Sequence, residues 1–90
     1  MKSINTKQMK TGLALIENNF IVSNASLDLE VEPSAVTDNL KTLIRNCPVE
    51  LFVYANKDKR GRGKIVNLTI KGREFFHYAK YFIESIEEAA

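Results

Sequence analysis

The chain has 90 residues, which suits one domain with a single hydrophobic core and leaves little for a second folded unit. Hydrophobic residues make up 44% of it and charged residues 27%, a balance that excludes the composition of a disordered chain. The net charge of +2 is too small to indicate a nucleic-acid partner by itself, so the distribution of charge must be considered instead.

The sequence lacks the features of several classes of protein. No apolar run approaches the ~20 residues that span a bilayer, and residues 1–12 lack the apolar segment of a secretory signal. We therefore expect a cytoplasmic protein with no membrane partner. The lone Cys47 is expected in the core, and no thiol or histidine cluster is spaced to hold a metal, so we expect no metal and no cofactor. His77, the only histidine, has no catalytic partner at motif spacing, and we expect no enzyme.

Three helices are predicted in the first half of the chain. Apolar residues recur at helical spacing over 6–18. A short second helix is predicted over 24–30, with Ser23 as its cap and apolar contacts from Ala25, Leu27 and Leu29. The third helix begins at Pro33, which suits a first helical position, and ends before Pro48.

The third helix, about 33–47, has two different faces. One is an apolar stripe of Val36, Leu40, Leu43, Ile44 and Cys47. The opposite face is polar and carries hydroxyl groups near its start and cations further along: Ser34, Thr37, Asp38, Lys41 and Arg45. Such a face is either an ordinary solvated surface or a binding surface.

After Pro48 the periodicity changes to two, which predicts strands over 51–54 and 64–69 joined by a charged hairpin over 55–63. A long last helix is predicted from residue 70 or 71 to 88. The whole is a mostly α fold with a small β hairpin, and residues 1–90 form a single domain. Three helices followed by a two-stranded hairpin are typical of the winged helix-turn-helix fold.

Charge is segregated along the chain. Residues 57–64 carry five basic residues against one acid, whereas residues 22–38 carry acids and no base. A basic run of this kind is either a solvated loop or an electrostatic footprint for phosphates.

Residues 34–52 resemble the recognition helix and following strand of LysR-type transcriptional regulators. The matching residues, aligned without a gap, are Ala35, Val36, Thr37, Leu40, Leu43, Val49, Leu51 and Phe52, with Leu68, Thr69, Gly72 and Ala79 further on. The resemblance covers about residues 25–83 and implies the DNA-binding domain of that family, standing alone without its effector-binding domain. The implied function is sequence-specific binding of double-stranded DNA by a transcriptional regulator.

The resemblance implies that the third helix enters the major groove and that residues 55–64 form a wing on the backbone or in the minor groove. The expected DNA-binding residues are Ser34, Thr37, Asp38, Lys41 and Arg45 on the helix, and Lys57, Lys59, Arg60, Arg62 and Lys64 in the wing. Two departures stand out: the wing is longer than is typical of the family, and Asp38 replaces a frequent arginine. Either Asp38 accepts a hydrogen bond from a cytosine amino group, or the docking differs from the usual one.

The last helix has more apolar residues than one buried stripe requires, so either a second subunit covers part of it or the excess is core. In the LysR-type family this helix pairs with its copy, which implies a homodimer. The interface expected within residues 70–88 consists of Phe75, Tyr78, Ala79, Phe82, Ile83 and Ile86. Two other functions stay open: a truncated partner that forms heterodimers with a full-length regulator, and a module for RNA or a protein assembly.

Overall fold

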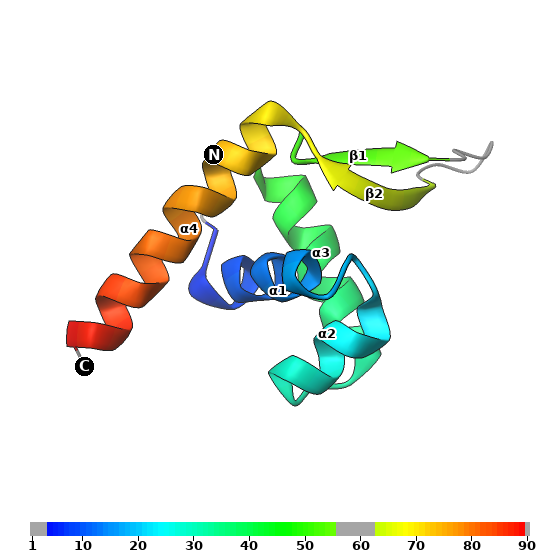
Figure 1. Ribbon diagram of the computed structural model, residues 1–90. Helices are drawn as coiled ribbons and strands as arrows, with labels where there is room; N and C mark the ends of the chain where they lie inside the picture. Colours follow the sequence, from blue (N-terminus) through cyan, green and yellow to red (C-terminus); the bar gives the residue numbers. More distant parts are fainter. Residues whose placement is uncertain (1–3, 56–62, 90) are drawn as a thin grey trace.

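A computed structural model describes residues 4–55 and 63–89 of the chain. Over these residues the fold is mostly helical, with four helices and a two-stranded antiparallel sheet (Figure 1). The elements in chain order are α1 (Thr6–Glu17), α2 (Val22–Leu29), α3 (Pro33–Asn46), β1 (Phe52–Ala55), β2 (Lys64–Leu68) and α4 (Ile70–Ala89). The predicted mostly α fold with a small β hairpin is confirmed at this level.

The first helix, α1, begins with a reciprocal cap. The Asn5 side chain accepts a hydrogen bond from the Gln8 backbone N–H at 2.9 Å, and the Gln8 side chain accepts one from the Asn5 backbone N–H at 3.4 Å. Two of the amides that a helix start leaves without partners are thereby satisfied. Gln8 is buried, and α1 starts at Thr6, the predicted residue.

Two sequence predictions for α2 are wrong: the cap at Ser23 and the apolar contact of Leu27. Asn19 and Phe20 both adopt left-handed backbone conformations, with φ of 55° and 63°, and this turn lets α2 begin at Val22 with Ile21 as its N-cap. Ser23 therefore lies inside the helix, and its predicted role as the cap is wrong. Leu27 was expected to supply an apolar contact but is 77% exposed, because α2 turns that side outward.

Helix α3 has the predicted bounds to within one residue, with Pro33 in its first turn. Val36 and Leu43 are fully buried, and Leu40 and Ile44 pack against the core, so the predicted apolar stripe is confirmed. Cys47, expected in the core, is half-buried and packs against the core from the C-terminal end of the helix, as predicted.

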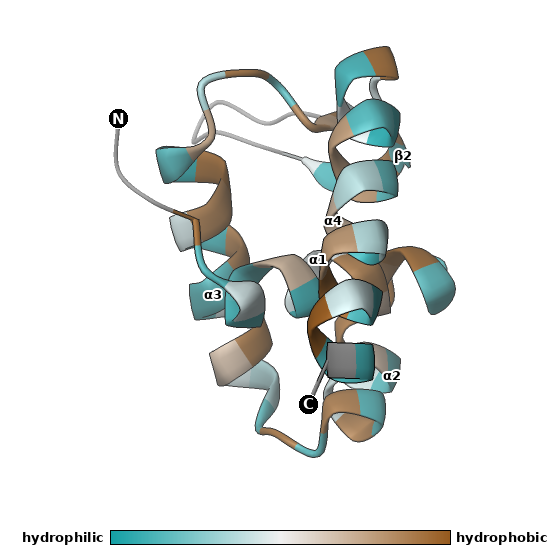
Figure 2. Cartoon of the chain, turned by 90° about the vertical axis from the view of Figure 1, so that its left-hand side faces the viewer, coloured by the Kyte–Doolittle hydropathy of each residue, from teal (hydrophilic) through white to brown (hydrophobic). Residues whose placement is uncertain are grey.

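The core consists of two adjoining clusters. Ala14, Leu15, Ala25 and Val36 join α1, α2 and α3, while Leu43, Leu51, Phe52, Phe76 and Ala79 join α3 to β1 and α4. Helix α1 contacts each of the other three helices and lies between α3 and α4 (Figure 2). The apolar face of α3 is thus held against the body of the molecule.

The sheet is a hairpin in which β1 pairs with β2 antiparallel. Phe52 lies opposite Leu68 and Ala55 opposite Lys64, with an irregular register after Val53 that leaves Val66 without an opposite residue. Such a bulge bends the strand and increases its twist. The hairpin and the C-terminal half of α4 extend in opposite directions (Figure 1), which accounts for the elongated shape of 45 × 28 × 22 Å.

Candidate nucleic-acid interface

The polar face of α3 lies on the surface of the molecule. Ser34, Asp38, Lys41 and Arg45 are all exposed, and they follow one another at the three- and four-residue spacing that aligns side chains along a helix. The opposite side of the same helix carries the fully buried Val36 and Leu43. The core therefore fixes the rotation of α3, and the polar face can meet a large partner without any change of fold.

Two threonines flank this exposed row and are half-buried. The Thr37 hydroxyl donates to the Pro33 carbonyl oxygen at 3.2 Å, and the Thr42 hydroxyl donates to the Asp38 carbonyl oxygen at 3.0 Å. Because each hydroxyl hydrogen is used within the helix, each oxygen offers only its lone pairs outward. Sequence analysis included Thr37 and missed Thr42, which its four-residue spacing from Asp38 would have indicated.

The base of the β hairpin lies beside the C-terminal end of α3. Ile44 of α3 and its C-cap residue Cys47 line a shallow cavity of about 150 Å³ together with Phe52 and Tyr54 of β1. Lys64, the first residue of β2, is exposed and lies opposite Ala55, the last residue of β1. The other predicted wing residues, Lys57, Lys59, Arg60 and Arg62, lie outside the described residues.

Acidic side chains occupy α2 and the turn that leads into α3. Asp28, Glu30 and Glu32 are all exposed, and Asp28 accepts a hydrogen bond from the Asn18 side-chain amide at 2.8 Å. Glu32 is the N-cap of α3 but forms no side-chain hydrogen bond to the helix amides. Along α3 the charge changes from these carboxylates near the start to Lys41 and Arg45 in the second half.

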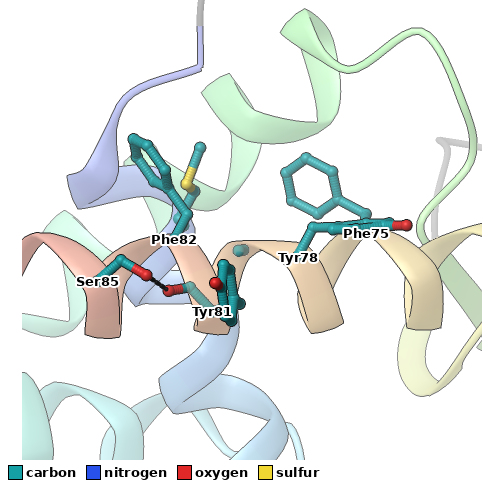
Figure 3. A pocket seen from close by; sticks show the side chains of 7 residues that line it. Phe75, Tyr78, Tyr81, Phe82 and Ser85 are labelled. Carbon is teal, nitrogen blue, oxygen red and sulfur yellow. Dashed lines mark hydrogen bonds between the residues drawn. The ribbon is translucent and has the colours of Figure 1, made fainter.

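A second surface feature is an open apolar groove of about 510 Å³ between α4 and α1. It is lined by Met9, Phe75, Tyr78, Ala79, Tyr81, Phe82 and Ser85. The rings of Phe75 and Phe82 rise from the same side of α4, and the Ser85 hydroxyl donates to the Tyr81 carbonyl oxygen at 2.9 Å (Figure 3). Hydrophobic stretches alternate with hydrophilic ones along α4 (Figure 2).

The expected subunit interface on α4 divides into exposed and buried residues. Tyr78 is 72% exposed, Phe82 48% and Ile86 45%, and Phe75 is half-buried. Ala79 and Ile83 are buried within the chain, because they face the core. Ala79 also lines the groove. Met9 and Tyr81 line the groove without having been predicted. Tyr81 follows Tyr78 by three residues, a spacing that indicates a shared helix face.

Within residues 4–55 and 63–89 no group of histidine, cysteine or carboxylate side chains is arranged to hold a metal ion. None of the described helices combines the length and the apolar composition needed to cross a bilayer. No protein-family model and no curated protein matches this chain.

Proposed function

We propose that this chain is a winged helix-turn-helix protein that binds double-stranded DNA as a cytoplasmic transcriptional regulator, similar to the DNA-binding domain of LysR-type regulators. In this proposal α2 and α3 form the helix-turn-helix, and α3 enters the major groove. One observation carries it: the row of Ser34, Asp38, Lys41 and Arg45 is exposed along the whole of α3, while the opposite side of that helix is fully buried.

The position of the hairpin supports the same proposal. Its base adjoins the C-terminal end of α3, the end that carries Arg45, so the hairpin can act as a wing beside a helix bound in the groove. The sequence of the wing, residues 55–64, is rich in lysine and arginine. Such residues bind phosphates and release counterions, which adds affinity with little dependence on base sequence.

We include a homodimer in this proposal, with a second copy of the chain in the α4 groove. Charge supports an antiparallel arrangement of the two α4 helices. From residue 70 to 80 the helix carries three bases and one acid, whereas from residue 81 onward it carries three glutamates and no base. Antiparallel pairing places each basic half beside an acidic half, and a two-fold axis would present two α3 helices to a roughly palindromic site.

The experiment is a titration of fluorescently labelled duplex DNA with the full chain at several salt concentrations. We expect affinity to fall steeply with salt. A double variant, Lys41→Ala with Arg45→Ala, should bind more weakly, and the slope of log affinity against log salt should decrease by about 0.9 for each of the two side chains that contacts a phosphate and not a base.

The matched control is Lys7→Ala, which removes an exposed lysine on α1, outside the row of α3 residues proposed to contact DNA and outside α4. It should leave affinity and slope unchanged. Absence of binding by the unaltered chain at low salt would contradict the proposal, as would an equal loss in the Lys7→Ala control. Absence of DNA binding together with stable pairing to a full-length regulator would favour the heterodimer function instead.

A further inference from the structure

We propose that Asp38 is a specificity-determining residue that selects cytosine by accepting a hydrogen bond from its exocyclic amino group in the major groove. The inference rests on the proposed DNA-binding function and names the base chemistry that this surface recognises. The Asp38 carboxylate lies on the exposed face of α3, among hydroxyl-bearing and basic residues that would otherwise suit a polyanion such as DNA.

The fold does not allow Asp38 to turn away from a ligand bound at this face. Val36 and Leu43 lie on the opposite side of α3, and both are fully buried. Rotating the helix enough to remove Asp38 from the face would expose these two apolar side chains to water, which is unfavourable. Any DNA that contacts Ser34 and Lys41 therefore also meets Asp38.

The Asp38 carboxylate also lacks a partner within the described part of the chain. Its backbone carbonyl accepts from Thr42, but its side chain forms no hydrogen bond or ion pair with a residue of the described ranges 4–55 and 63–89. An exposed carboxylate repels phosphates, so its favourable position in a complex is against a base edge that offers a hydrogen-bond donor.

Only one base fits this requirement without a penalty. A carboxylate accepts hydrogen bonds and donates none. In the major groove guanine presents two acceptors, thymine an acceptor and a methyl group, and adenine a donor beside the N7 acceptor. Cytosine presents its N4 amino donor with no acceptor beside it on the same base. Asp38 is therefore matched to cytosine.

Arg45 sets a second expectation for the same site. It follows Asp38 by seven residues, about 10.5 Å along a helix that rises 1.5 Å per residue. Base pairs are about 3.4 Å apart along each strand, so the two side chains address positions about three base pairs apart where α3 follows the groove. Because arginine pairs with O6 and N7 of guanine, the preferred half-site combines a cytosine with a guanine about three steps away.

The test is selection of bound sequences from a random duplex pool with the unaltered chain, Asp38→Asn and Asp38→Ala. We expect the unaltered chain to enrich a cytosine that Asp38→Asn replaces by adenine, since asparagine pairs with N6 and N7 of adenine. Asp38→Ala should lose the preference at that position alone. Glu17→Gln, which removes an exposed carboxylate from the end of α1, should keep the original site.

A direct measurement then replaces the selected cytosine by 2-pyrimidinone, which lacks the amino group. The unaltered chain should bind this duplex about 5- to 150-fold more weakly, and Asp38→Ala should bind the two duplexes equally. If a sequence is enriched but the Asp38 variants keep every base preference, the inference is overturned and DNA binding stands. If no sequence is enriched and no duplex binds, the proposed function itself fails.

Discussion

At the scale of single residues, two glycines allow the helices and the hairpin to approach one another closely. A Cβ atom at Gly72 would meet the backbone carbonyl of Leu51, and a Cβ atom at Gly12 would meet the Phe76 ring. Both glycines are buried within helices, where alanine would otherwise be preferred by about 1 kcal/mol. The absence of a side chain is therefore a packing requirement at both positions.

Gly72→Ala should destabilise the fold, because the atoms in the way belong to the backbone of Leu51 and cannot move aside as a side chain does. We expect a loss of about 1–3 kcal/mol in the free energy of unfolding, measured by chemical denaturation. Gly12→Ala should cost less, since the Phe76 ring can shift. Lys80→Ala, at an exposed position on α4, should stay within about 0.5 kcal/mol of the unaltered chain. A Gly72→Ala variant of undiminished stability would contradict the close approach.

At the scale of secondary-structure elements, Thr69 joins the sheet to α4. Its hydroxyl donates to the Glu50 carbonyl oxygen at 2.6 Å and accepts from the Gly72 backbone N–H at 2.8 Å. Its own backbone N–H donates to the Leu51 carbonyl oxygen at 3.0 Å. One residue thus caps α4 and binds the segment before β1, which sets the directions in which the hairpin and the helix leave the body.

Thr69→Val should lower the free energy of unfolding by about 1–2 kcal/mol, because valine keeps the shape and removes both side-chain hydrogen bonds. Thr69→Ser retains the hydroxyl and should lie close to the unaltered chain, which separates the hydrogen bonds from the methyl group. The measurement is equilibrium denaturation followed by circular dichroism. Equal stability of the valine and serine variants would show that the cap contributes little.

At the scale of the whole molecule, the hairpin and α4 extend from a three-helix body in opposite directions (Figure 1). The exposed face of α3 carries Lys41 and Arg45, whereas α4 carries the apolar groove with its exposed tyrosines. In the proposed function one end would contact DNA and the other a second copy, so the proposed dimer formation and DNA binding use different surfaces.

Tyr78→Glu should convert the proposed dimer into a monomer at micromolar concentration, because it places a charge in the apolar groove. Tyr78 is 72% exposed, so the fold of the single chain should be unaffected and the circular dichroism spectrum unchanged. Size-exclusion chromatography with light scattering measures the mass. His77→Glu adds the same charge one residue away, outside the groove lining, and should remain a dimer. A monomeric unaltered chain would contradict the arrangement.

The sequence by itself determined the order, the type and most bounds of the elements, because hydrophobic periodicity and the prolines at 33 and 48 act locally. The stripe of Val36 and Leu43 on α3 was visible for the same reason, and with it the polar face opposite. The predicted start of α2 was wrong because the backbone before it adopts a conformation that local preference disfavours. The left-handed residues Asn19 and Phe20 moved the start of α2 from the predicted Ser23 cap to Val22.

Only the tertiary structure decided which apolar residues are covered. Helical spacing places Ala79, Ile83, Phe82 and Tyr78 on one helix but cannot say which of them α1 and α3 will bury. The packing of α1 against α4 buries the first two and leaves the others exposed around the groove. Burial depends on contacts between segments far apart in the chain, such as Gly12 against Phe76, and no local pattern encodes those contacts.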